Sequence, residues 1–248
     1  MSLQKPVAAP SRRSLRLAAC GLALAGAVVL AALTYRAGGP GNWLLASVFT
    51  AERILPLVGL GLILGQLPRR ALPFALASLV LGAAAGGFFR EPFFALMAPV
   101  PGAAAHLFLT GPIACVLIGL PLVLPRGARA WIALPLLAPA GAMLAVATLL
   151  GDPTLHEWSY RPLAFAAEVW ISATVALAAA AFDRTWLTVA ARIFASWLIA
   201  IGFLYGGAYM AAKRTALEPP PFPAPPADGA FPGFGRVLQE LDGKEPAG

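Results

Sequence analysis

Residues 71–89 read ALPFALASLVLGAAAGGFF and contain no charged side chain. Arg69 and Arg70 precede this run, and Arg90 and Glu91 follow it. An α-helix rises about 1.5 Å per residue, so a run of about 20 residues can cross the hydrocarbon core of a bilayer, which is roughly 30 Å thick. The stretch therefore predicts a transmembrane helix bounded by charge at both ends.

The rest of the chain repeats this pattern. Six further apolar runs have spanning length, at 17–35, 44–67, 103–124, 130–150, 163–182 and 186–212. Proline, glycine and charged residues gather between the runs, and these residues mark the ends of helices. The sequence therefore predicts an all-α fold, a polytopic transmembrane helix bundle of seven spans over residues 17–212. Residues 92–102 are too short to cross, and we expect an interfacial turn or a re-entrant piece there.

Composition leads to the same class. Hydrophobic residues make up 59% of the 248 residues, charged residues only 12%, and the mean hydropathy is +0.78. Soluble domains carry roughly 25% charged residues, because water must wet their surfaces. A soluble enzyme is therefore excluded. The sequence also has no HExxH or GxSxG motif, so we expect no enzymatic activity, no catalytic residues and no resident cofactor.

Glycines four residues apart occur on three of the predicted spans. In lipid, apolar helices associate where small residues let their backbones approach closely. The pairs are Gly61 and Gly65, Gly82 and Gly86, and Gly202 and Gly206. Together they predict a compact bundle.

The first run has two interpretations. Arg12, Arg13 and Arg16 precede an apolar core, which is also the arrangement in a secretory signal peptide. The core at 17–33 is longer than the roughly 7 to 15 residues of such a region, and a poor cleavage site follows it. We therefore favour an uncleaved first span, and a cleaved signal would leave six spans.

The formal charge of +7 does not indicate nucleic-acid binding, because the basic residues flank the apolar runs instead of forming a stripe. With the N-terminus inside, nine Lys and Arg residues lie on the inner side and three on the outer side before the last span. The positive-inside rule then predicts that the basic N-terminus at 1–16 lies inside and the C-terminus outside. We expect the protein in a bacterial inner membrane, where these sides are the cytoplasm and the periplasm. Lys213 and Arg214 argue against this orientation, since they would lie outside.

The tail at 213–248 differs in composition from the bundle. Eight prolines lie between Thr215 and Gly248. Such a sequence favours an extended polyproline conformation over packed structure. We expect a flexible tail that serves as a spacer or binds a membrane or periplasmic protein partner.

A charge at the bilayer centre costs roughly 2.5 to 3.5 kcal/mol even on the lenient insertion scale, so ionisable residues inside spans are candidate functional residues. They are Glu52, Arg53, His106, Glu168 and Arg192. All except Arg192 fall in the predicted outer half of the membrane, and His156 and Glu157 lie in an outer loop. One hypothesis is a vestibule that holds a divalent cation or relays protons. The other is that Glu52 or Glu168 pairs with Arg53 or Arg192 to hold the helices together.

Residues 50–66, TAERILPLVGLGLILGQ, resemble a stretch of the HupE/UreJ family of hydrogenase and urease accessory membrane proteins. In that family an Asp-His pair opens an apolar helix that ends in glycines and a Gln, and Glu52 and Arg53 stand at that pair here. The resemblance implies movement of nickel or a similar divalent cation by means of His, Asp and Glu residues. Among the ionisable residues inside the spans, we expect His106, Glu52 and Glu168 to be the ligands. Only two histidines, His106 and His156, occur in the chain.

Two functions follow as hypotheses. The first is a HupE/UreJ-like transporter or permease-like accessory protein that moves a cation or a proton past Glu52, His106 and Glu168. The second is a membrane scaffold or assembly subunit that transports nothing and binds a partner through its proline-rich tail. Both place the protein in the lipid bilayer.

Overall fold

A computed structural model describes residues 11–35, 40–97, 109–154, 158–182 and 185–214. The chain divides into two compact units, Met1–Ala208 and Tyr209–Gly248. All packing described below lies within the first unit. The predicted tail at 213–248 and His106, His156 and Glu157 lie outside the described residues, apart from Lys213 and Arg214 at the end of the last helix.

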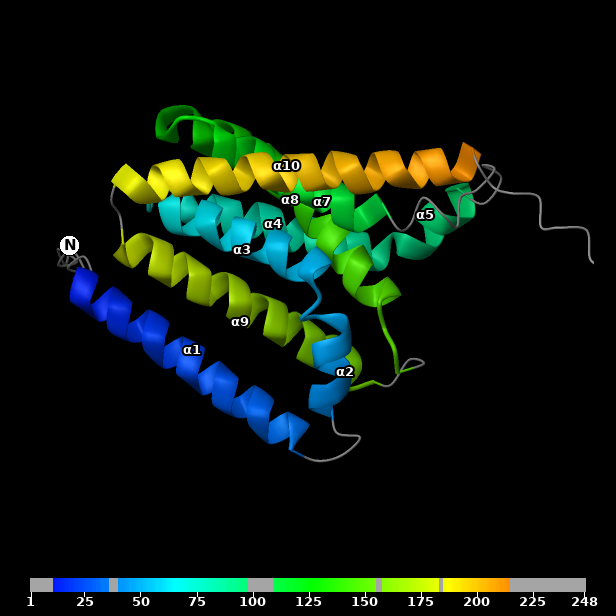
Figure 1. The fold of residues 1–248 in the computed structure, drawn as a ribbon, viewed down its shortest axis with the longest axis horizontal. Coiled ribbons are helices and arrows are strands. Elements are labelled where there is room, and N and C mark those ends of the chain that lie inside the picture. Colours follow the sequence, from blue (N-terminus) through cyan, green and yellow to red (C-terminus); the bar gives the residue numbers. More distant parts are fainter. Residues whose placement is uncertain (1–10, 36–39, 98–108, 155–157, 183–184, 215–248) are drawn as a thin grey trace, which may run out of the picture. The chain divides into compact units, whose positions relative to one another are not determined.

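The described part of the chain is helical and contains no strand. The two N-terminal helices of the bundle are α1 and α2, and Figure 1 shows α1 lying beside α9. The helices are α1 (Arg12–Thr34), α2 (Pro40–Ser47), α3 (Ala51–Gln66), α4 (Leu72–Phe88), α5 (Arg90–Met97), α7 (Thr110–Val123), α8 (Arg126–Leu150), α9 (Tyr160–Ala181) and α10 (Thr185–Arg214).

In the described part of the chain, four helices are long and apolar enough to cross a membrane: α1, α8, α9 and the Thr185–Ala208 part of α10. The α2–α3 pair is a fifth if its two pieces count as one span. The 17 residues of α4 and the 14 residues of α7 are apolar but shorter. The helices are therefore compatible with a multi-pass integral membrane protein. The predicted total of seven spans is not confirmed.

The second predicted span, 44–67, is not one straight helix. It consists of α2 and α3, which meet at an angle of 80°. Thr50 has an extended backbone (φ −76°, ψ 150°), and its carbonyl accepts the N–H groups of Arg53 and Ile54 at 3.1 and 2.9 Å, so a new helix begins there. The break places Glu52 and Arg53 in the first turn of α3. Of the segment 92–102, the structure describes only residues 92–97, which belong to the short helix α5.

Glycines let the helices pack closely, as their spacing predicts. A Cβ at Gly86 of α4 would lie 2.6 Å from the carbonyl oxygen of Ala142 on α8, and one at Gly82 would overlap the Ala138 carbonyl. Real Cβ atoms essentially never come within 3.0 Å of other heavy atoms, so α4 and α8 touch through their backbones.

The other two glycine pairs differ from each other. Gly61 and Gly65 of α3 both face α9, and a Cβ at Gly61 would lie 2.7 Å from the carbonyl oxygen of Ser172. A Cβ at Gly202 of α10 would also lie 2.7 Å from a carbonyl oxygen, that of Pro112 on α7. A Cβ at Gly206, by contrast, would have its nearest neighbouring atom at 4.0 Å. The predicted close approach is therefore confirmed for two pairs and for one member of the third.

The packed interior lies between α3, α7, α8 and α10. Its fully buried side chains include Ile63, Ile118, Leu122, Leu137 and Leu198. By contrast α1 packs chiefly on α9, where Trp170 covers Gly26 and its ring N–H donates to the Leu22 carbonyl at 2.8 Å.

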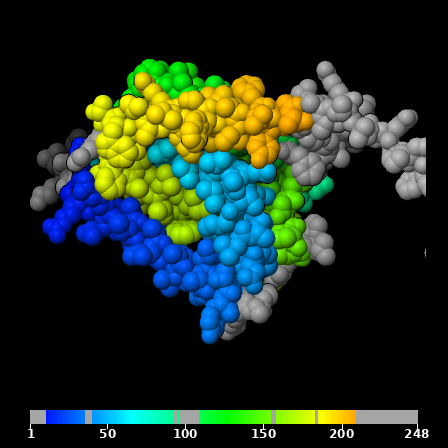
Figure 2. Space-filling view, in the orientation of Figure 1, coloured from blue at the N-terminus to red at the C-terminus, as the bar shows by residue number. Residues whose placement is uncertain are grey.

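Large apolar side chains remain exposed on the outer helices. In Figure 2 the surfaces of α1 (blue) and α10 (yellow to orange) are both open on the face shown. More than half of each of the following side chains is exposed: Leu17, Leu24, Val28 and Val29 on α1, and Trp186, Val189, Ile193, Trp197, Phe203 and Leu204 on α10. An apolar surface of this extent is what lipid contact requires.

Candidate functional site: a buried ion pair at the end of α8

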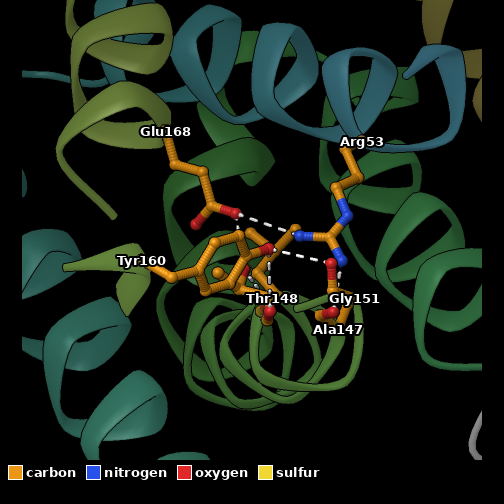
Figure 3. A network of polar contacts seen from close by, with 7 residues as sticks. Arg53, Ala147, Thr148, Gly151, Tyr160 and Glu168 are labelled. Atoms are coloured by element: carbon orange, nitrogen blue, oxygen red, sulfur yellow. Dashed lines mark hydrogen bonds and ion pairs between the residues drawn. The ribbon is translucent and has the colours of Figure 1, made fainter. Parts of the chain in front are cut away.

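Three helices bring polar side chains together inside the bundle (Figure 3). Arg53 comes from the first turn of α3, Thr148 from the last turn of α8, and Glu168 from the middle of α9. Glu168 is only 8% exposed, and Thr148 is fully buried. Two of the residues that sequence reasoning selected, Arg53 and Glu168, therefore lie together.

Arg53 joins the acidic side chain to the end of α8. Its Nη1 lies 3.8 Å from Glu168 Oε1, and its Nη2 donates a hydrogen bond to the Ala147 carbonyl. The last carbonyls of an α-helix have no partner within the helix, and they carry the negative end of its dipole. A guanidinium is a favourable neighbour for that end, so α8 and Glu168 both hold Arg53 in place.

Gly151 leaves the room that Arg53 occupies. It follows the last residue of α8, and a Cβ built on it would overlap Nη2 of Arg53 and lie 2.9 Å from its Cζ. Any larger residue would therefore push the guanidinium away from the Ala147 carbonyl.

Tyr160 closes the other side of the same helix end. Its ring is fully buried and lies against Trp43 of α2, with ring centroids 5.2 Å apart. Its hydroxyl lies 3.0 Å from the Gly151 carbonyl and 3.3 Å from the Thr148 carbonyl. Together Arg53 and Tyr160 supply hydrogen bonds to carbonyls that α8 leaves open.

Thr148 connects Glu168 to the α8 backbone. Its Oγ1 lies 2.5 Å from Glu168 Oε1 and 2.9 Å from the Leu144 carbonyl. A threonine hydroxyl has one hydrogen, so it can donate to only one of these oxygens. When Glu168 is protonated, the acid donates to Thr148 and Thr148 donates to Leu144, which satisfies both contacts. When Glu168 is ionised, Thr148 donates to the carboxylate and Arg53 balances its charge.

The remaining predicted residues lie elsewhere. Glu52 is exposed although it precedes Arg53 in the same turn. Arg192 is exposed on α10, and it has no acidic partner among the residues that the structure describes. His106, His156 and Glu157 are outside the described ranges, so no position can be given for them. Within those ranges no three His, Cys, Asp or Glu side chains gather as a group that could hold a metal ion.

Sequence reasoning missed Thr148, Gly151 and Tyr160. A signal for Thr148 was present, since it is a polar residue near the outer end of the predicted span 130–150, the end at which Arg53 and Glu168 are also expected. The roles of Gly151 and Tyr160 depend on contacts between helices, which no local pattern indicates.

A second buried arginine has a different role. Arg129 is one of the nine basic residues that the sequence assigns to the inner side as loop charges, but it is only 1% exposed. It donates to the side-chain oxygen of Gln66 and to the carbonyls of Pro121, Leu122 and Leu124, the last three at 3.2, 2.9 and 3.2 Å. These carbonyls lie at the C-terminal end of α7, so Arg129 caps that helix and joins it to α3 and α8.

Comparison of the chain with known protein families, with curated proteins and with solved structures found no match. The resemblance of residues 50–66 to the HupE/UreJ family thus stays a prediction.

Proposed function

We propose that this protein is a multi-pass membrane transporter that couples its work to proton movement, with Glu168 as the residue that binds the proton. The observation that carries the proposal is the Thr148 hydroxyl, which contacts the Glu168 carboxylate and the Leu144 carbonyl with a single hydrogen to donate. Such a network accommodates Glu168 both with and without a proton.

Protonation of Glu168 would change the balance of charge between Glu168 and Arg53, and with it the interactions between the helices that carry them. A carboxylate inside the membrane is costly unless a cation is close, and Arg53 is that cation. Protonation of Glu168 removes its negative charge and leaves the Ala147 carbonyl as the partner of Arg53 among the described residues. Since Arg53, Thr148 and Glu168 stand on three different helices, proton binding changes the forces between α3, α8 and α9.

Among the residues that the structure describes, few other charges act on Glu168 from the helices around it. On α3 the other acid, Glu52, is exposed, and α2 has no ionisable side chain. Arg126 and Arg129 lie at the opposite end of α8. On α1 the basic residues are near its N-terminus, where Arg16 lies over Phe182, about 21 Å along α9 from Glu168.

The broken second span supports transport as the class of function. Transporters commonly place their substrate sites where a membrane helix is interrupted, because the freed backbone groups can bind ions there. The 80° break between α2 and α3 comes directly before the turn that carries Arg53. Nickel or another divalent cation as cargo is the narrower prediction from the family resemblance, and His106, Glu52 and Glu168 are the ligands expected from the ionisable residues inside the spans.

The proposal is tested by comparing Glu168→Gln with Glu52→Gln in proteoliposomes. The two acids belong to the same bundle, but only Glu168 is buried against Arg53 and Thr148. We expect Glu168→Gln to abolish acidification of the lumen under a pH gradient, read with an enclosed pH-sensitive dye, and Glu52→Gln to leave it intact.

Infrared difference spectra between low and high pH provide a second readout. The chain has 11 Asp and Glu residues that can contribute to these spectra, so we expect Glu168→Gln to remove one component of the protonated-carboxyl band, which Glu52→Gln leaves in place. If Glu168→Gln changes neither flux nor spectrum, Glu168 is the structural half of an ion pair and the proposal is wrong.

A further inference from the structure

We propose that Glu168, Thr148 and the Ala147 carbonyl form a binding site for one monovalent metal cation, of the sodium or potassium class, and that Arg53 is a built-in competitor for it. This inference shares Glu168 with the proposed function, but it goes beyond it and does not require that a proton moves. In the structure described here the guanidinium of Arg53 lies between Glu168 Oε1 and the Ala147 carbonyl (Figure 3), and Thr148 Oγ1 contacts the same Glu168 oxygen.

The oxygens of the proposed site are of the kinds that bind alkali cations. Glu168 Oε1 is a carboxylate oxygen, and Thr148 Oγ1 is a hydroxyl oxygen 2.5 Å from it. The Ala147 carbonyl lies in the last turn of α8 and accepts a hydrogen bond from Arg53. Hard oxygen ligands suit cations without a preference for nitrogen or sulfur, and the C-terminal ends of membrane helices coordinate sodium in known transporters.

Arg53 fits this position incompletely. Its Nη1 is buried and has no hydrogen-bond partner within the described ranges, since the 3.8 Å to Glu168 Oε1 exceeds hydrogen-bond length. A buried donor without an acceptor is unfavourable. A spherical cation has no fixed donor directions, so it can be coordinated by the same oxygens without leaving a group unsatisfied.

Net charge selects a monovalent ion over a divalent one. With Arg53 in place, the single carboxylate of Glu168 and the guanidinium are neutral together. If Arg53 withdraws, one monovalent cation restores that neutrality. A divalent cation would leave a net positive charge in a low-dielectric interior, which is strongly unfavourable.

Two features of the chain allow the arginine to withdraw. Arg53 stands three residues after the 80° break between α2 and α3, so a change in that angle moves its whole side chain. Its place beside the Ala147 carbonyl exists only because Gly151 has no side chain. The geometry thus describes a site that either Arg53 or a free cation occupies.

The test is thermal unfolding of the full-length protein in detergent, in chloride salts of sodium, potassium, calcium or the bulky cation N-methylglucamine at equal ionic strength. We expect the wild type to show the same Tm in all four. Arg53→Met removes the competitor, and its Tm should rise in a saturable way by about 3 °C or more in sodium or potassium. The double variant Arg53→Met/Glu168→Gln should lose that rise.

Gly151→Ala is a second route to the same result. It keeps every charge, but its methyl group would displace the guanidinium, so it too should gain an alkali-cation response. If Arg53→Met does not fold, Gly151→Ala still tests whether displacing Arg53 produces an alkali-cation response. No alkali-cation response in either variant, or a larger response to calcium than to sodium, would overturn the inference. Both outcomes are independent of the flux measured for Glu168→Gln, so failure here is distinct from failure of the proposed function.

Discussion

Substitution of Gly86 by alanine tests the close contact between α4 and α8. The added Cβ would lie 2.6 Å from the carbonyl oxygen and 2.7 Å from the Cα of Ala142. Both atoms belong to the α8 backbone, so no side chain can move aside. The helices must separate by about 0.4 to 0.8 Å to restore ordinary contact, and overpacking of this kind costs about 1 to 3 kcal/mol.

The adjacent glycine is a matched control. Gly87 lies in the same turn of α4, but a Cβ there would meet no atom within 4 Å. Gly87→Ala therefore reports only the higher helix propensity of alanine, worth up to about 1 kcal/mol of added stability. Gly82→Ala should be the most harmful of the three, because its Cβ would overlap the Ala138 carbonyl.

The measurement is the free energy of unfolding of the purified protein in mixed micelles as the fraction of denaturing detergent rises. We expect stability to fall in the order Gly87→Ala, Gly86→Ala, Gly82→Ala, with the first at or above the wild type. The difference between Gly86→Ala and Gly87→Ala isolates the packing effect. Equal stability of these two variants would refute the backbone contact between α4 and α8.

Three further predictions use the same assay. Thr148→Val keeps the shape of the side chain but removes the hydroxyl beside Glu168, so we expect a loss of about 1 to 3 kcal/mol that Thr148→Ser largely restores. Arg129→Met leaves the carbonyls at the end of α7 without their donor and should cost about 3 kcal/mol or more, whereas the exposed Arg70→Met should stay within about 0.5 kcal/mol of the wild type. Trp170→Phe removes the hydrogen bond from α9 to the α1 backbone, and we expect a loss of about 0.6 to 1 kcal/mol; no loss would mean that α1 packs without it.

The helical class of the protein follows from local properties of the sequence. Long uncharged runs such as residues 71–89 have no way to satisfy their backbone groups in lipid except as helices. The glycine pairs were readable for the same reason, since a small residue repeated every four positions marks one face of a helix.

The apolar runs of the sequence did not determine the number of spans. Residues 44–67 look like one apolar run, yet the extended backbone at Thr50 divides them into α2 and α3. That break depends on how the two pieces pack against the rest of the bundle, for example Trp43 against Tyr160 and Gly61 against Ser172. Hydropathy averages over such local changes of direction.

The sequence by itself determined that the chain forms apolar helices suited to a bilayer. It also identified Glu52, Arg53, Glu168 and Arg192 as ionisable residues inside predicted spans and therefore as candidate functional residues. Only the tertiary structure decided among them, because burial and pairing join residues that are far apart in the chain. Glu52 and Arg53 are neighbours in sequence, but one is exposed and the other reaches Glu168 and the end of α8. Helix spacing sets which direction a side chain takes, whereas only the packing of α3, α8 and α9 determines what it meets there.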